Sequence, residues 1–106
     1  MLAGGVGSRF WPVSTPERPK QLLPLVTADP MLRDTVDRVA KLAPPERILI
    51  LTNASLVDAM RRVIPELPAG NIIAEPRPAG TTAALAWAAH EIARRGGPDA
   101  LMISVQ

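Results

Sequence analysis

LAGGVGSRFWP, at residues 2–12, follows the first methionine of this 106-residue chain, and PKQ comes soon after at residues 19–21. Glycine at three of the four positions 4–7 lets the backbone turn tightly and bring its N–H groups close to a ligand. Arg9 and Lys20 add two positive side chains to the same stretch. Backbone donors combined with a guanidinium and an ammonium group suit a phosphate or pyrophosphate better than a neutral ligand. The stretch therefore predicts an anion-binding loop.

The spacing of the glycines excludes two well-known phosphate-binding motifs. A dinucleotide-binding fingerprint requires G-x-G-x-x-G, and counting from Gly5 the last position of that motif is Phe10. A P-loop requires Gly-Lys followed by Ser or Thr, and this stretch has no such ending. The loop follows a third pattern, in which an Arg and the Trp11-Pro12 pair come after the glycines. Because Pro12 adjoins it, Trp11 is expected to pack beneath the loop.

Further motifs follow in order along the chain. Residues 2–14 read L-A-G-G-x-G-x-R-x-W-P-x-S, residues 22–25 continue PKQ with LLPL, and residues 72–85 contain I-x-E-P ahead of a helix start rich in Thr and Ala. In these motifs and their order the chain resembles the sugar-1-phosphate nucleotidyltransferases. The Trp11-Pro12 pair is most similar to the mannose-1-phosphate guanylyltransferases within that family.

The resemblance implies an activity and its partners. A nucleotidyl (GMP) group would pass from GTP to mannose 1-phosphate, giving GDP-mannose and pyrophosphate, with Mg²⁺ bridging the phosphates. Two alternatives stay open: a catalytically incomplete nucleotide-binding fragment, and a nucleotidyltransferase for another hexose 1-phosphate or another nucleotide. The second is motivated by Ala79-Gly80, since relatives commonly carry Arg-Asn ahead of the residue that is Thr81 here. Arg77 is a candidate for the missing cation.

The resemblance covers residues 1–106 and corresponds to an N-terminal part of such an enzyme. It implies that the carboxylate that helps to hold the magnesium lies beyond Gln106. We therefore expect one nucleotide-binding part, truncated at its C-terminal end, with no metal-ligating residue of its own. The sequence leaves open whether the chain forms an oligomer.

The same resemblance assigns roles to individual residues. Leu2 and Ala3 would present main-chain groups to the base, and the turn from Glu75 to Thr81 would close the base pocket. Arg9, at the β- and γ-phosphates, and Lys20, at the α-phosphate or the sugar phosphate, are the expected catalytic residues. The full set of expected nucleotide-binding residues is Leu2, Ala3, Gly4, Gly5, Gly7, Ser8, Arg9, Glu75 and Thr81.

Apolar runs and helical patterns alternate along the chain, which predicts the α/β class: a Rossmann-like open, mostly parallel sheet with helices on both faces, in an incomplete nucleotidyltransferase fold. In such sheets ligands bind beyond the carboxyl ends of the strands, so the glycine loop and Glu75 are expected at one edge. The expected strands are residues 1–3, 47–52, 71–75 and 100–105. The expected helices begin at Asp29-Pro30, at Ser55 and at Thr81 or Thr82, each with a side-chain N-cap, and end near Leu42, Val63 and Arg95.

Composition narrows the functional classes. The net charge of +2 is too small to favour nucleic acid as a partner, and the basic residues are dispersed. No apolar run approaches the roughly 20 residues of a membrane span, and no basic segment precedes the first apolar residues as in a signal peptide. The chain has no Cys, which excludes disulfides and thiolate chemistry. We expect a cytoplasmic protein with neither a membrane nor a nucleic-acid partner.

Overall fold

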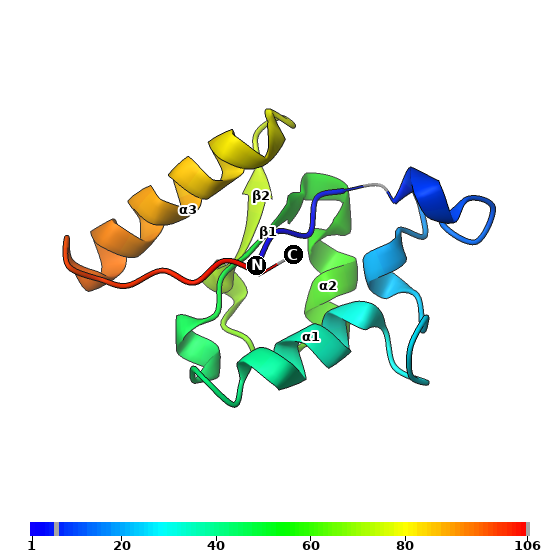
Figure 1. The fold of residues 1–106 in the computed structure, drawn as a ribbon, viewed down its shortest axis with the longest axis horizontal. Coiled ribbons are helices and arrows are strands. Elements are labelled where there is room, and N and C mark those ends of the chain that lie inside the picture. The colour runs from blue at the N-terminus through cyan, green and yellow to red at the C-terminus, as the bar shows by residue number, and fades with distance from the viewer. Residues whose placement is uncertain (6, 106) are drawn as a thin grey trace.

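In a computed structural model of the chain, residues 1–5 and 7–105 are described, so predictions that involve Val6 or Gln106 lie outside the described residues. Helices lie on two sides of a small sheet (Figure 1). Short 3-10 turns interrupt the long loop at residues 4–26, among them Ser8–Phe10 and Lys20–Leu22. The regular elements in chain order are α1 (Met31–Val39), β1 (Ile50–Asn53), α2 (Val57–Val63), β2 (Ile72–Glu75) and α3 (Gly80–Gly96).

The sheet is parallel wherever strands pair. β1 and β2 run side by side with Ile50 opposite Ile72. On the other side of β1, residues 1–3 join through a parallel bridge between Leu2 and Leu51. The start of the chain therefore lies next to the middle strand, as the predicted open, mostly parallel sheet requires.

Helices cover both faces of this sheet, which confirms the predicted architecture. Successive side chains of a strand point to opposite faces, and β1 uses both. Ile50 is fully buried with Val36 of α1 and Met60 of α2 in one apolar cluster. Leu51, next along the strand, is buried in a second cluster with Ala84 of α3. Figure 1 shows α3 on one side and α1 and α2 on the other.

Side-chain caps were expected at the helix starts, and none of the three helices has one. The N-cap positions are Pro30, Leu56 and Ala79, and no side chain accepts a capping hydrogen bond there. Ser55 falls inside a 3-10 turn, Ala54–Leu56, that leads into α2. α3 begins earlier than expected, at Gly80, so that Thr81 lies within its first turn.

The expected fourth strand, residues 100–105, is absent from the described residues. Within the described residues, its backbone bond to the sheet runs from the N–H of Leu2 to the carbonyl of Val105, at 3.1 Å, and Met102 packs against the cluster that contains Leu51. A strand needs a ladder of such bonds, and residues 1–3 are too short a partner to supply one. The side chains of Leu101 and Ile103 are 87% and 70% exposed.

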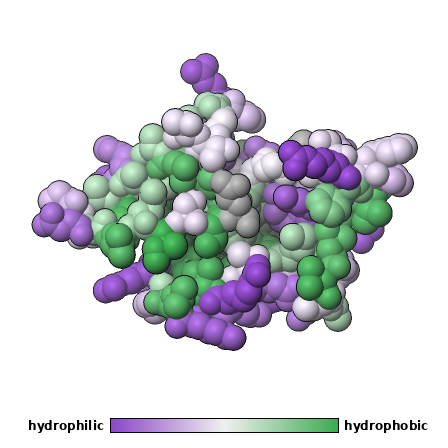
Figure 2. Space-filling model, viewed as in Figure 1, coloured by the Kyte–Doolittle hydropathy of each residue, from purple (hydrophilic) through white to green (hydrophobic). Residues whose placement is uncertain are grey.

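Beside residues 100–105 lies an apolar groove of about 770 Å³, which Figure 2 shows as green surface between α3 and α1. Its walls come from α1, β1, α3 and the C-terminal segment and include Val39, Leu42, Leu85 and Ile92. The first helix was expected to end near Leu42. Because that helix ends at Val39 instead, Leu42 is 80% exposed. Among the described residues, no helix combines the length and the apolar character needed to cross a membrane.

Candidate functional site

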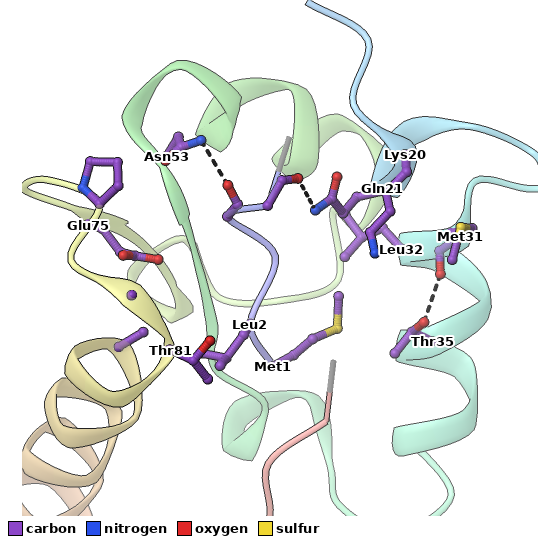
Figure 3. A pocket seen from close by; sticks show the side chains of 15 residues that line it. Met1, Leu2, Lys20, Gln21, Met31, Leu32, Thr35, Asn53, Glu75 and Thr81 are labelled. Carbon is purple, nitrogen blue, oxygen red and sulfur yellow. Dashed lines mark hydrogen bonds between the residues drawn. The ribbon is translucent and has the colours of Figure 1, made fainter. Parts of the chain in front are cut away.

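A cleft of about 360 Å³ opens at the edge of the sheet where β1, β2 and residues 1–3 end (Figure 3). This is the carboxyl edge of the parallel strands, where ligands bind in open α/β sheets. Its lining residues come from the glycine loop, the turn after it, α1, the ends of both strands and the start of α3. They are Met1, Leu2, Gly4, Gly5, Lys20, Gln21, Met31, Leu32, Thr35, Asn53, Glu75, Pro78, Gly80, Thr81 and Ala84.

Gly7 and Gly4 are the glycines that the local geometry requires. Gly7 has φ +66°, a left-handed conformation that side chains disfavour. A Cβ there would lie 3.0 Å from Cγ of Lys20 and 3.0 Å from Oγ of Ser14. At Gly4 a Cβ would lie 3.0 Å from Oε1 of Glu75. The loop therefore packs directly against the stem of Lys20 and against the carboxylate of Glu75.

The carbonyl groups of the loop are held by side chains from elsewhere in the chain. Nε2 of Gln21 donates to the carbonyls of Ala3 and Gly5, at 3.1 and 2.8 Å. Nδ2 of Asn53 donates to the carbonyl of Gly4, at 3.1 Å. The N–H groups of Gly4 and Gly5 donate to no other described residue. The loop thus has occupied carbonyls and open N–H groups, the arrangement that an anion requires.

Two more carbonyl contacts complete this arrangement. Oγ1 of Thr52 donates to the carbonyl of Ala3 at 3.3 Å, and Oγ of Ser14 donates to the carbonyl of Gly7 at 3.1 Å. Both donors are buried, with 0% of Thr52 and 2% of Ser14 exposed. The loop is therefore bonded to β1 on one side and to the following turn on the other.

Opposite charges occupy opposite walls of the cleft. Lys20 projects from the turn on one side and Glu75 from the end of β2 on the other (Figure 3). Nζ of Lys20 lies 6.0 Å from the centre of the Phe10 ring, a cation–π distance. Among the described residues, the side-chain carboxylate of Glu75 has no hydrogen-bond or ion-pair partner. The cleft offers a cation for an anionic group at one end and a free acceptor at the other.

The structure brings most, but not all, of the expected nucleotide site to this cleft. Ala3 is 1% exposed, and its N–H donates to the carbonyl of Leu51, so only its neighbours face the cleft. Gly7, Ser8 and Arg9 lie outside the lining, and Arg9 is exposed on the turn Ser8–Phe10. Those that line the cleft are Leu2, Gly4, Gly5, Lys20, Glu75 and Thr81.

Two further side chains singled out in the sequence, those of Trp11 and Arg77, are exposed. Trp11 was expected to pack under the loop, yet it is 76% exposed, directly after the turn Ser8–Phe10. Arg77, the candidate replacement cation, is exposed and lies outside the lining of the cleft.

Sequence reasoning did not identify Gln21, Asn53 or Thr35 as site residues, although all three line the cleft. A signal for Asn53 was present, since it is a polar residue at the carboxyl end of a buried parallel strand. Gln21 is part of the PKQ motif, but its burial, with 7% exposed, could not be read from the motif. Thr35 donates to the carbonyl of Met31 and gave no sequence signal.

The described residues do not make a magnesium site. Hard cations prefer several oxygen ligands, above all carboxylates. Glu75 is the only carboxylate among the residues that line the cleft, and no group of three or more His, Cys, Asp or Glu side chains gathers elsewhere in the described ranges. The described lining of the cleft thus offers one carboxylate, that of Glu75, as a candidate metal ligand.

The chain is similar in sequence to proteins named mannose-1-phosphate guanylyltransferase. A mannose-1-phosphate guanylyltransferase from Sinorhizobium fredii is 35% identical over 105 residues, which is 97% of this chain and 20% of that protein. The enzyme of the same name from Salmonella muenchen is 41% identical over 91 residues, 84% of this chain and 19% of that protein. The chain thus spans about a fifth of the length of these curated relatives.

A solved structure and a family model agree with these relatives. A protein from Thermus thermophilus, described as a mannose-1-phosphate geranyltransferase, superposes with a TM-score of 0.76 at 35% identity, covering 90% of this chain and 28% of that one. The family model for nucleotidyl transferases matches residues 1–104. The chain therefore belongs to the nucleotidyl transferase family.

Proposed function

We propose that the protein containing this chain transfers a GMP group from GTP to mannose 1-phosphate, releasing GDP-mannose and pyrophosphate. Membership of the nucleotidyl transferase family and the names of the relatives support this proposal. The observation that carries it is the cleft itself, in which open N–H groups of the glycine loop and the ammonium of Lys20 stand opposite the free carboxylate of Glu75. A cytoplasmic location belongs to the proposal, because nucleoside triphosphates and sugar phosphates are cytoplasmic metabolites.

In the proposed reaction, an oxygen of the sugar phosphate forms a bond to the α-phosphorus of GTP. The bond from that phosphorus to the oxygen bridging to the β-phosphorus breaks, and its electron pair leaves with pyrophosphate. Such transfers depend on positioning and on stabilising negative charge rather than on covalent help from the protein. Mg²⁺, which the family resemblance implies, would supply part of that stabilisation, and the roles below concern only residues of this chain.

Phosphate binding is assigned to the glycine loop and two cations. The N–H groups of Gly4 and Gly5 would donate to phosphate oxygens within the cleft, and Lys20 would neutralise the α-phosphate or the sugar phosphate. Arg9 lies on the exposed turn beyond Gly7, outside the cleft lining. It would therefore meet the β- and γ-phosphates, which extend along the loop away from the base, where charge increases as pyrophosphate leaves.

Base selection is assigned to Glu75. An unpaired carboxylate would repel phosphates, so it is suited to the part of the ligand that carries N–H donors. Guanine presents two adjacent donors, N1–H and the 2-amino group, which match the two oxygens of a carboxylate. Adenine presents only its amino group on the corresponding edge. Thr81 and Leu2 line the same wall and would border the base.

Turnover by the full-length protein tests the proposal. Pyrophosphate release should require mannose 1-phosphate and should be faster with GTP than with ATP. Replacing either Lys20 or Arg9 by Ala should lower kcat by about a hundredfold, as loss of a charge stabiliser does. Lys41→Ala is the matched control, because Lys41 is exposed and outside the cleft lining.

Each other outcome has a definite meaning. GTP binding without pyrophosphate release would favour a nucleotide-binding protein over an enzyme. Turnover with another sugar phosphate or another nucleotide would keep the reaction class and replace the substrates. Wild-type rates in both cation variants would reject the assigned site.

A further inference from the structure

The peptide groups of the glycine loop could face the cleft in either of two ways. In a trans peptide the carbonyl and the N–H of the same unit point in opposite directions. The carbonyl of Ala3 shares its unit with the N–H of Gly4, and the carbonyl of Gly4 shares its unit with the N–H of Gly5. Whatever holds each carbonyl therefore also directs the N–H that follows it.

The glycines themselves do not fix which way these peptide units face, because a glycine backbone changes conformation at little cost. A flipped unit would present a carbonyl oxygen to the cleft and repel a phosphate. Gln21 and Asn53 oppose this flip from outside the loop, since their side-chain amides donate to the carbonyls of Ala3, Gly5 and Gly4. The dashed lines in Figure 3 show bonds made by these two side chains to the loop.

Among the described residues, both side-chain hydrogen bonds of Gln21 are made to the carbonyls of Ala3 and Gly5. Its Nε2 makes two bonds to loop carbonyls, whereas its Oε1 is buried and accepts no hydrogen bond from any described residue. A buried acceptor without a partner is costly, so a side chain kept in this state must be retained by its other contacts. Both of those contacts are with the carbonyls of the loop.

We propose that Gln21 and Asn53 are positioning residues of the nucleotide site, which keep the N–H groups of the glycine loop directed at the phosphates of the ligand. This inference rests on the proposed function. In this positioning role, neither side chain needs to touch the nucleotide. It also separates the loop, which would bind any triphosphate, from Glu75, which would distinguish bases.

Calorimetric titration of the full-length protein with GTP, ATP and inorganic tripolyphosphate tests the proposal. Asn53→Ala should weaken binding of all three ligands by a similar factor, at least about tenfold, because a weakened phosphate site does not depend on the base. Gln21→Glu keeps the shape of the side chain and replaces the donor by an oxygen, and it should weaken binding similarly at neutral pH. Each affinity is compared with wild type at the same pH, which cancels any titration of the ligand and of groups common to both proteins.

Lowering the pH gives a readout that a merely structural role would not produce. Burial favours the neutral form of a carboxyl group, and a protonated carboxyl can donate a hydrogen bond. The Gln21→Glu variant should therefore regain affinity, relative to wild type, as the pH falls toward 5. Unfolding in urea, followed in parallel, reports any loss of stability separately.

Asn71→Ala is the matched control. Asn71 is 4% exposed, and its Nδ2 also donates to two backbone carbonyls, those of Pro45 at 3.3 Å and Glu46 at 3.0 Å, but at the opposite edge of the sheet. It should reduce stability and leave the affinity of the folded protein unchanged. If Gln21→Glu does not fold, Asn53→Ala against Asn71→Ala decides the question.

Three results would overturn the inference: wild-type affinity in Asn53→Ala, an equal loss in Asn71→Ala, or a Gln21→Glu variant whose folded form gains nothing at low pH. The proposed function fails differently. In that case wild-type protein itself would bind neither GTP nor tripolyphosphate.

Discussion

Gly7 is the position at which one added carbon would disturb the site most. Its φ of +66° lies in the region that costs a residue with a side chain about 1–2 kcal/mol. Its Cα also faces the stem of Lys20 and the hydroxyl of Ser14, each 3.0 Å from where a Cβ would be. Gly7 lines no part of the cleft, yet it packs against the side chain of Lys20, whose ammonium group is the cation of the cleft.

Gly7→Ala should therefore impair binding more than folding. We expect an unfolding free energy lower by about 1–2 kcal/mol and a loss of GTP affinity of about tenfold or more, since Lys20 must move. Urea unfolding and calorimetry measure the two effects. Gly70→Ala is the control, because a Cβ there meets nothing within 4 Å and φ is not positive. Equal affinities in the two variants would contradict the expectation.

At the scale of elements, the C-terminal end of α3 is fastened to the turn before β2. The carboxylate of Glu91 pairs with Arg94 at 2.8 Å and with Arg95 at 3.0 Å. Arg95 also donates to Oδ1 of Asn71 at 2.8 Å and to the carbonyl of Gly70 at 2.9 Å. One carboxylate thus orients the guanidinium that joins the helix to the sheet.

This network predicts a pH dependence. Hydrogen bonds from Arg94 and then Arg95 lower the pKa of Glu91 from 4.5 to about 2. A carboxyl whose pKa is lower in the folded than in the unfolded state stabilises the fold when ionised, and that contribution is lost as the pH falls from about 4.5 through 2. Glu91→Gln should therefore reduce stability at neutral pH and show a weaker loss of stability across that acid range.

Urea unfolding of wild type and variant at neutral pH and between pH 4.5 and 2 measures the effect of Glu91. Glu46→Gln serves as the control, since Glu46 is exposed and its side chain forms no ion pair with a described residue. A gap between wild type and Glu91→Gln that stays constant over this range would contradict the assignment.

Sequence patterns identified the elements better than their boundaries. The run at residues 48–51 predicted β1 because four adjacent apolar side chains require burial on both faces of a parallel sheet, and all four are buried. The predicted side-chain caps at Ser55 and Thr81 were wrong because the prediction rested only on the spacing of residue types along the sequence. The actual starts follow from local turns, such as the 3-10 turn before α2, which leave no characteristic spacing.

For the site, topology was predictable and contacts were not. Parallel strands require that the glycine loop and Glu75 meet at one edge, and they do. The bonds from Gln21 and Asn53 to the loop depend on rotamers and on a backbone path that only the packed structure provides. The expected roles of Arg9, Lys20 and Glu75 remain predictions.

At the scale of the whole molecule, β1 contributes a buried residue to each of the two apolar clusters, whereas residues 100–105 contribute the partly buried Met102 to the second cluster. Leu51 is 1% exposed beneath α3, and Leu101 is 87% exposed. A leucine side chain therefore contributes differently to the stability of the fold at these two positions. Burial, which the apolar pattern alone could not assign to Leu101, makes the difference.

We expect Leu51→Ala to lower the unfolding free energy by about 2–5 kcal/mol, through lost burial and a cavity. Leu101→Ala in the 106-residue chain should change it by less than about 0.5 kcal/mol. Denaturant unfolding of both variants measures this contrast. A large loss in Leu101→Ala would mean that residues 100–105 are packed as a strand after all.

The bonds of Leu2 have a consequence for how the protein is made. Residues 1–3 are synthesised well before Leu51 and Val105, yet they bond to both of these residues in the fold. Contacts between such distant parts of a chain form slowly, because the intervening segment must be drawn into a closed loop. The glycine loop follows directly after residues 1–3, so its position depends on the pairing of that segment. During synthesis, the glycine loop should therefore become able to bind phosphate only after Val105 has been translated and the helices on both faces of the sheet have packed.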